Sequence, residues 1–126
     1  MPIYVIHEHN ATHLHWDFRL ELGGVLKSWA VPKQPPLRRG IKRLAIAVQD
    51  HAKSYANFEG EIISGYGKGA VKIWDKGNFS IEKKQPKEIV INMQGKKLKG
   101  RYALIKTGYG KDKNYLGFDL VNILGR

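Results

Sequence analysis

The side chains best suited to metal chemistry are concentrated near the start of the sequence. Four of the five histidines lie between residues 7 and 15, and the fifth is His51. Polar and apolar residues alternate over residues 13–22, a period of two that is typical of a half-buried β-strand. One face of this strand is apolar, and the other carries His13, His15, Asp17, Arg19 and Glu21.

Neighbouring positions on that polar face are close enough to share an ion. Same-face residues of a strand lie about 6.5–7 Å apart, so His15 and Asp17 can converge on a metal at about 2.0–2.2 Å. The preceding residues form another predicted strand with a turn at residues 10–12, and this hairpin would bring His9, or His7, beside His15. Two imidazoles and a carboxylate suit Mn²⁺, Fe²⁺ or Zn²⁺ and leave positions open for water and substrate.

Arg19 lies on the same face and indicates the kind of substrate. A merely solvated polar face would alternate in the same way, but a guanidinium on the same face as the imidazoles argues for a site. The planar fork of arginine matches phosphate oxygens, so the cluster favours an anionic substrate such as a phosphate ester.

The composition indicates one folded domain with a polyanionic partner. The chain has 126 residues, enough for a single core, and we expect one domain over residues 1–126. Lysine and arginine number 22 against 11 aspartates and glutamates, and the resulting net charge of +11 favours nucleic acid as the partner. The alternative is the solvated basic surface of a thermophile protein. Because the chain has no cysteine, any metal must be held by histidine and carboxylate groups.

The sequence gives no sign of membrane insertion or export. No apolar run approaches the roughly 20 residues that a membrane span needs. Residues 1–4 lead directly into a predicted strand, without a charged or apolar leader. We therefore expect a soluble, cytoplasmic protein with no membrane partner.

The rest of the chain predicts short strands separated by turns. Gly23-Gly24 predicts a tight hairpin turn, residues 32–42 a basic, proline-rich loop, and residues 52–58 one helical turn or an irregular loop. The glycines that follow are not succeeded by a helix, which argues against a P-loop. Strands are expected at residues 4–9, 13–22, 25–31, 43–50, 70–75, 78–82, 88–93, 98–106 and 114–121, with a turn at Lys76-Gly77. This pattern favours an all-β, mainly antiparallel fold, a β-barrel of about eight strands with little helix, or else a strongly curved sandwich.

Motifs spaced along the chain resemble one protein family. In order they are His9-x-Ala-x-x-Leu-His15-Trp-Asp17-Phe-Arg19-Leu-Glu21, Leu26-Lys-Ser-Trp-Ala-Val-Pro-Lys33, Arg43-Leu-Ala, Asp50-His51, Tyr55-Ala-x-Phe-Glu-Gly60 and Tyr66-Gly-x-Gly-x-Val-x-x-Trp-Asp-x-Gly77. Together they closely resemble the 3′-phosphoesterase domain of bacterial DNA ligase D and its stand-alone archaeal and bacterial relatives. The resemblance covers residues 3 to about 106 and implies a compact β-barrel with an active-site groove on one side.

The resemblance implies a role for eight residues. They are three manganese ligands, three groups that contact the scissile phosphate and two basic residues of the substrate groove: His9, His15 and Asp17; Arg19, His51 and Tyr55; and Lys33 and Arg43. Co²⁺ and Zn²⁺ are alternative ions. In these roles the metal draws charge from a phosphate oxygen, while Arg19 and His51 neutralise charge that builds in the transition state. His51 is also a candidate to protonate the leaving oxygen.

The implied reaction is end processing in nucleic-acid repair. It removes a 3′-terminal ribonucleoside, leaving a 3′-phosphate, and then removes that phosphate to leave a 3′-OH that a ligase can join. The implied partners are DNA or RNA 3′ ends and a separate DNA ligase or polymerase, as in non-homologous end joining.

The sequence also departs from the family pattern in three places. Asn10 replaces a common aspartate, Gln49 replaces a common acidic residue, and residues 62–64 replace a proline-containing bend. These departures bear on the shape of the groove and on the balance of the two activities.

Two other classes of function compete with this interpretation. His15-Trp-Asp17 with a distant His51 also spells the His-x-Asp…His pattern of non-haem iron oxygenases. The second alternative is a catalytically silent barrel that binds nucleic acid through basic and aromatic surface residues such as Tyr4, Tyr66 and Tyr109.

Overall fold

The computed structural model describes residues 1–63, 65, 68–107 and 117–123. Within these ranges the chain forms β1 (Ile3–Asn10), β2 (Leu14–Leu22), β3 (Val25–Val31), β4 (Lys42–Ala52), the 3₁₀ helix η1 (Lys53–Asn57), β5 (Gly60–Ile62), β6 (Gly69–Gln85), β7 (Glu88–Gly95), β8 (Lys99–Lys106) and β9 (Gly117–Asn122). All of their pairings are antiparallel. None of the helical structure described is long and apolar enough to cross a bilayer. The prediction of an all-β antiparallel fold with little helix is confirmed.

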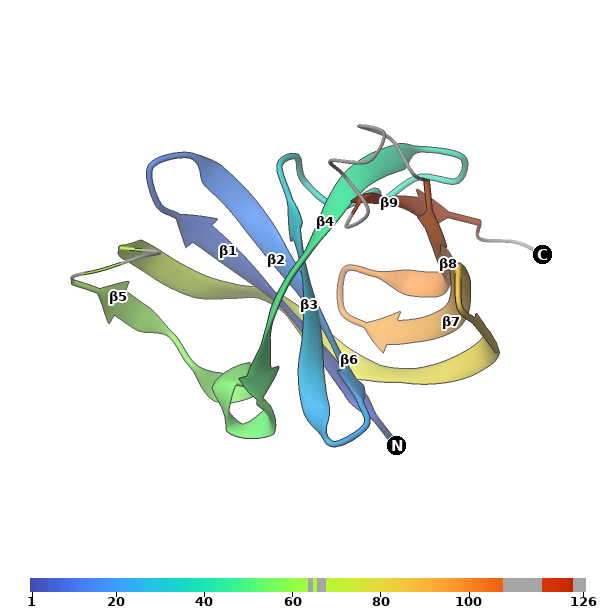
Figure 1. Cartoon of the computed structure of the whole chain (residues 1–126), viewed down its shortest axis with the longest axis horizontal. Coiled ribbons are helices and arrows are strands. Elements are labelled where there is room, and N and C mark those ends of the chain that lie inside the picture. The colour runs from blue at the N-terminus through green and yellow to red at the C-terminus, as the bar shows by residue number, and fades with distance from the viewer. Residues whose placement is uncertain (64, 66–67, 108–116, 124–126) are drawn as a thin grey trace.

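Eight of the strands close into a barrel. Neighbouring strands follow the order β1-β2-β3-β4-β9-β8-β7-β6-β5, and β1 pairs in addition with β6. This pairing closes the ring and leaves β5 as an extra strand beside the first part of β6 (Figure 1). Closure satisfies backbone groups that an open sheet would expose at its edges, and it holds β1 between two partners.

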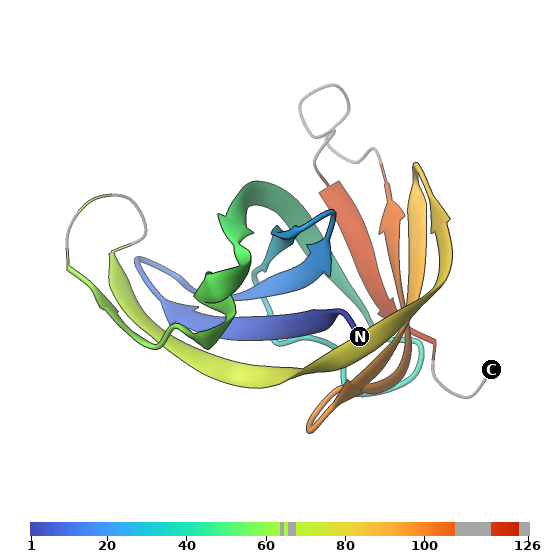
Figure 2. The ribbon, with the colours of Figure 1, turned by 90° about the horizontal axis from the view of Figure 1, so that it is seen from below.

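The strand β6 is long and curved, and it pairs with different neighbours along its length (Figure 2). Its first half pairs with β1, and its second half pairs with β7. The turn expected at Lys76-Gly77 was therefore wrong, because the strand runs through it. Gly77 serves a close approach instead, since a Cβ atom there would lie 2.3 Å from the carbonyl oxygen of Gln94.

A β-bulge in β6 changes which of its residues face the barrel interior. Ile6 pairs with Asp75, but the next residue of β1, His7, pairs with Ile73, so Trp74 is an extra residue in β6. Asp75 therefore shares the side of Tyr4, to which it is hydrogen-bonded. Ile73 packs on the opposite, outer side of the sheet.

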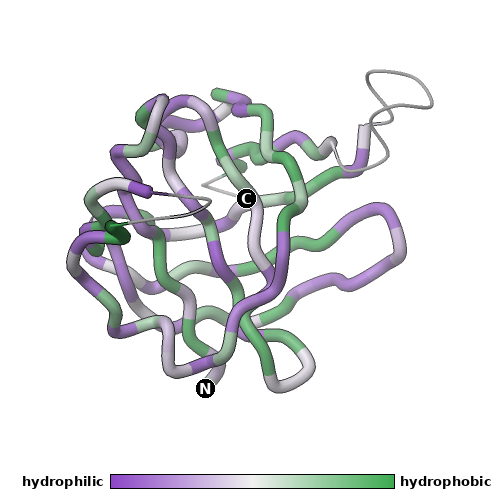
Figure 3. Tube along the Cα trace, turned by 60° about the vertical axis from the view of Figure 1, so that its left-hand side comes forward, coloured by the Kyte–Doolittle hydropathy of each residue, from purple (hydrophilic) through white to green (hydrophobic). Residues whose placement is uncertain are grey.

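Apolar side chains from all eight barrel strands fill the interior, and most of them are large. Hydrophobic and hydrophilic residues are interspersed along the strands, as the alternation of faces requires (Figure 3). Side chains with no exposed surface in this core include Tyr4, Phe18, Leu20, Phe79 and Leu120. Burial of such residues stabilises the barrel by about 1.5–3 kcal/mol for each large apolar side chain.

A second, smaller cluster covers part of the outer side of the barrel. Val5 of β1 and Leu26 of β3 pack there against Ala56 of η1, with Tyr55 and Ile73 at its margin. Since η1 follows β4 directly, this cluster holds the helix against β3 (Figure 1). The outer face of the first strands is thus covered by protein rather than open to solvent.

One buried carboxylate fastens the turn between β7 and β8 to the barrel. Asp75, 4% exposed, accepts a hydrogen bond of 2.5 Å from the hydroxyl of Tyr4. It also accepts three backbone N–H bonds of 2.9–3.1 Å, from Lys96, Lys97 and Leu98. Burial and the hydrogen bond to Asp75 together raise the pKa of Tyr4 above its ordinary value.

Replacing this carboxylate should destabilise the protein strongly. In Asp75→Asn the amide group sets N–H donors against backbone N–H donors, which we expect to cost about 2–4 kcal/mol in the free energy of unfolding. The matched control is Asp50→Asn, because Asp50 is exposed and paired with Lys27 at 3.3 Å, and it should change stability by about 0.5 kcal/mol or less. Urea titration of both variants measures the difference, and equal losses would contradict the assignment.

Candidate active site

The three residues expected to bind metal meet beside the turn of the β1–β2 hairpin. The antiparallel register sets His9 opposite His15, and Asp17 lies two residues further along β2. One ligand atom from each residue lies within 4.8 Å of the others. Asp17 Oδ2 is 3.3 Å from His9 Nδ1, and Asp17 Oδ1 is 3.2 Å from His15 Nε2. This donor set fits a divalent ion such as Mn²⁺, Fe²⁺ or Zn²⁺ and leaves coordination positions for other ligands.

The hydrogen bonds around His15 fix which of its nitrogens faces the cluster. His15 Nδ1 donates to the carbonyl of His13 at 3.1 Å, so Nε2 is the atom that faces Asp17. The hydrogen bond to Asp17 raises the pKa of His15, although burial opposes this. Burial acts to raise the pKa of Asp17, but the hydrogen bond with His15 and the charge of Arg19 outweigh it and hold that pKa below its usual range. A metal must compete with a proton for His15, so its affinity should fall at low pH.

Arg19 lies next to the candidate ligands and is held on all sides. It is 3% exposed, and its Nη2 lies 3.3 Å from Asp17 Oδ2. Its Nη1 donates to Ser28 Oγ at 2.9 Å, and its Nε donates to His7 Nδ1 at 3.1 Å. Its Cζ lies 5.0 Å from the centre of the Tyr55 ring. Burial lowers the pKa of Arg19 and the charge of Asp17 opposes this, so the side chain stays a cation at neutral pH.

Three rings form a stack on the same side of the barrel. Tyr55 is stacked on His51, with ring centres 4.4 Å apart and planes 20° apart, and on Phe58, at 5.0 Å and 11°. His51 belongs to β4 itself, since the strand runs to Ala52 and does not end before His51 as expected. Burial and the nearby charge of Arg19 lower the pKa of His51, and burial raises that of Tyr55. At neutral pH both groups are therefore uncharged hydrogen-bond donors in the free protein.

Sequence reasoning left His7 as an alternative metal ligand, and the structure gives it different partners. His7 has no exposed surface, and its Nε2 donates to the carbonyl oxygen of Phe58 at 3.0 Å. Burial and the charge of Arg19 lower the pKa of His7 to about 4. Sequence reasoning did not anticipate Ser28 as a partner of Arg19. The register of the β2–β3 hairpin, which sets Ser28 opposite Arg19, was the signal that could have identified it.

The sequence of the chain matches one known protein family over most of its length. The sequence profile of the DNA Ligase D 3′-phosphoesterase domain matches residues 7–106. The chain belongs to this family. Every candidate ligand and every residue of the ring stack falls within the matched range.

Relatives of the chain are much longer proteins that contain this domain. The multifunctional non-homologous end joining DNA repair protein LigD of Mycobacterium tuberculosis is 50% identical over 109 residues, which cover 82% of this chain and 14% of the relative. The LigD protein of Pseudomonas aeruginosa is 48% identical over 110 residues, 82% of this chain and 13% of the relative. That of Mycolicibacterium smegmatis is 44% identical over 125 residues, 90% of this chain and 16% of the relative. The chain thus spans only about a seventh of the length of these relatives.

The two basic residues expected in the substrate groove line one hollow. Lys33 and Arg43 line a hollow of about 230 Å³ with Pro32, Lys42 and Leu44. Arg43 Nε donates to the carbonyl oxygen of Gln34 at 2.7 Å. The lining of this hollow includes none of the other six residues that the 3′-phosphoesterase resemblance singled out.

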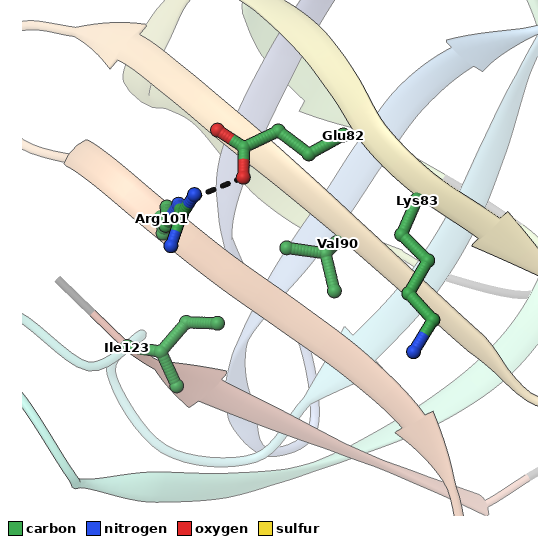
Figure 4. Close-up of a pocket in the computed structure, with 5 residues that line it drawn as sticks. All are labelled: Glu82, Lys83, Val90, Arg101 and Ile123. Carbon is green, nitrogen blue, oxygen red and sulfur yellow. Dashed lines mark ion pairs between the residues drawn. The ribbon is translucent and has the colours of Figure 1, made fainter. Parts of the chain in front are cut away.

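A larger hollow lies on a different part of the barrel and has no catalytic character (Figure 4). It measures about 420 Å³ and is lined by Glu82, Lys83, Val90, Arg101 and Ile123. The Nε of Arg101 pairs with a Glu82 oxygen at 2.7 Å, as the figure shows. Because its charges are paired and no described histidine lines it, this hollow is not a second candidate active site.

The structure bears on both alternatives to a 3′-phosphoesterase. The metal-ligand group found among the described residues takes His9, not His51, as its second histidine, so the oxygenase-type pattern is not the set that forms. Tyr4 is fully buried, so it is not the surface aromatic that the silent-barrel hypothesis needed. Tyr66 and Tyr109, together with Ser64 of the altered bend, lie outside the described residues. The other departures, Asn10 and Gln49, are both exposed.

The candidate metal site can be tested by comparing the metal affinity of variants at two histidines of the same hairpin. We expect wild-type protein to bind one Mn²⁺ and His15→Ala to lose at least about tenfold in affinity, because a third of the ligand set is removed. The matched control is His13→Ala, whose side chain is exposed and lies outside the ligand group. Isothermal titration calorimetry measures both, and equal affinities for the two variants would contradict the metal centre.

Proposed function

We propose that the protein is a metal-dependent phosphoesterase that processes the 3′ ends of nucleic-acid strands. It removes a 3′-terminal ribonucleoside, a 3′-phosphate or both, and leaves a 3′-OH that can be ligated. The observation that carries this proposal is the contact between a three-residue metal-ligand group and a buried arginine, in a chain of the 3′-phosphoesterase family.

The metal would be held by His9, His15 and Asp17, and Mn²⁺ is the ion we propose, with Co²⁺ and Zn²⁺ as alternatives. When bound, it supplies Lewis-acid polarisation of a phosphate oxygen and can lower the pKa of a bound water. Asp17 would act both as a metal ligand and as the counter-charge of Arg19, because its carboxylate lies within 3.3 Å of the two histidines and of Arg19.

Arg19, His51 and Tyr55 would contact the scissile phosphate. Arg19 offers a fixed cation that stabilises negative charge developing on the phosphate oxygens. His51 is uncharged in the free protein because its pKa is lowered, so it first acts as a hydrogen-bond donor. A phosphate dianion nearby would raise that pKa again, which makes proton transfer to the leaving oxygen available to His51. Tyr55 orients His51 by stacking and keeps its hydroxyl proton because burial raises its pKa.

The strand itself would be held by its backbone. The net charge of +11 favours any polyanion, and Lys33 and Arg43 are placed in one hollow where they can hold a phosphate away from the reacting one. A 3′ end cleaned in this way is a substrate for a DNA ligase or polymerase, which we propose acts as a separate partner in end-joining repair.

Removing a phosphate-contacting group should lower the rate without removing the metal. We expect Arg19→Ala and His51→Ala to lose on the order of 10²-fold in kcat, as is usual when a partner of the transition-state charge is deleted. Mn²⁺ affinity, measured by calorimetry, should stay near that of wild type for His51→Ala. His13→Ala is the control and should keep the wild-type rate. Near-normal rates in folded Arg19→Ala and His51→Ala proteins would contradict the assigned roles.

The substrate end can be tested with three primers labelled at the 5′ end. A primer ending in one ribonucleotide should be shortened at its 3′ terminus much faster than an all-deoxy primer, and a primer ending in 3′-phosphate should be converted to 3′-OH. Activity should require added Mn²⁺ and should fall as salt rises, because the backbone contacts are ionic. Internal cuts, or equal rates on the deoxy and ribo ends, would exclude a 3′-phosphoesterase while leaving another metal-dependent esterase open. Binding without any cleavage would favour the silent barrel.

A further inference from the structure

His7 is a buried histidine that belongs to neither the metal-ligand group nor the ring stack. It has no exposed surface, and the group of candidate ligands among the described residues does not include it. Its two ring nitrogens both have partners: Nε2 faces the carbonyl oxygen of Phe58 at 3.0 Å, and Nδ1 faces Arg19 Nε at 3.1 Å. Its ring also meets the Tyr55 ring edge-on, with centres 5.2 Å apart.

These partners fix the tautomer of His7. A carbonyl oxygen only accepts hydrogen bonds, so the Nε2 that faces Phe58 carries the proton. The Nε of Arg19 only donates, so the Nδ1 that faces it is unprotonated and accepts. The backbone of Phe58 thereby determines that His7 presents an acceptor to Arg19.

The contact with His7 completes the immobilisation of the Arg19 guanidinium. An arginine has five N–H donors. Here Nε donates to His7 and Nη1 donates to Ser28, while Nη2 forms an ion pair with Asp17 at 3.3 Å. The further N–H groups of Nη1 and Nη2 would be available to a phosphate, which arginine can bind through two nitrogens at once. Without the bond to His7, the guanidinium would be held through its Nη atoms alone, and its buried Nε–H would have no acceptor.

We propose that His7 is a positioning residue, which acts on the reaction only by holding Arg19 through its Nε. This assignment rests on the proposed function, because it gives Arg19 a reacting phosphate to meet. Fixing a cation in advance lowers the barrier by sparing its reorganisation when charge develops on the phosphate.

The test is a double-mutant cycle on the metal-loaded protein with the ribonucleotide-ended primer. His7→Leu should lower kcat by about tenfold or more, the loss expected for one hydrogen bond to a charged group, with little change in KM or in Mn²⁺ affinity. His7→Gln should lose less, because its amide offers both an acceptor and a donor. In an Arg19→Ala background His7→Leu should cause no further loss, since the group through which it acts is gone. His13→Leu is the matched control and should keep the wild-type rate.

A second measurement detects the hydrogen bond between Arg19 Nε and His7 directly and does not depend on catalytic activity. The Arg19 Nε–H signal in a ¹H–¹⁵N spectrum should be protected from solvent exchange in the wild type and should lose that protection in His7→Leu. If His7→Leu does not fold, His7→Gln in both backgrounds carries the cycle. A wild-type rate for His7→Leu, losses that multiply with Arg19→Ala, or an unchanged Arg19 Nε–H signal would each overturn the proposal. Wild-type protein that is inactive on every primer would instead overturn the proposed function, and the Nε–H signal would still decide whether His7 holds Arg19.

Discussion

The site depends on one buried carboxylate. Asp17 is 5% exposed, and a lone charge so placed would cost several kcal/mol, so it persists only because cationic or hydrogen-bonding groups surround it. Its two oxygens serve His9, His15 and Arg19 at 3.2–3.3 Å. The same oxygens therefore hold the guanidinium in place and form part of the donor set for a metal. Loss of Asp17 would leave Arg19 buried without its counter-charge, so the fold near the site and its chemistry are linked through this residue.

Sequence reasoning predicted what local periodicity determines. The alternation of residues 13–22 placed Asp17 and Arg19 on one face of β2, and the hairpin brought His9 to His15, because strand period and antiparallel register depend only on nearby residues. The number and spacing of the strands predicted an antiparallel barrel or a strongly curved sandwich, and the family resemblance favoured the barrel that forms. The family motifs then singled out His51 and Tyr55, which lie 29 and 33 residues beyond the end of β2.

What the sequence could not show is set by contacts between distant segments. Arg19 was expected on a face open to the substrate, yet it is 3% exposed, because η1 and its flanking residues cover the first strands. The hydrogen-bond partner of His7 is the carbonyl oxygen of Phe58, 51 residues away. The pattern of polar and apolar residues cannot predict such a contact, because every residue has a backbone carbonyl. On β4 it is Ala45 that lies in the core while Leu44 and Val48 are 39% and 41% exposed, because Trp29 and other large side chains of neighbouring strands already fill the interior.

The extra residue Trp74 makes β6 a strand with two phases. On one side of the bulge Asp75 shares the interior with Tyr4, and on the other Ile73 supports the layer in which η1 and the ring stack lie. Deleting one residue here would turn every side chain of one half of β6 to the wrong face, burying a lysine or exposing the core. A change of one residue in length at this point therefore cannot be corrected by the neighbouring residues of β6. In an alignment of relatives, a gap inside the Trp74-Asp75 segment would mark a chain whose site layer has been rebuilt.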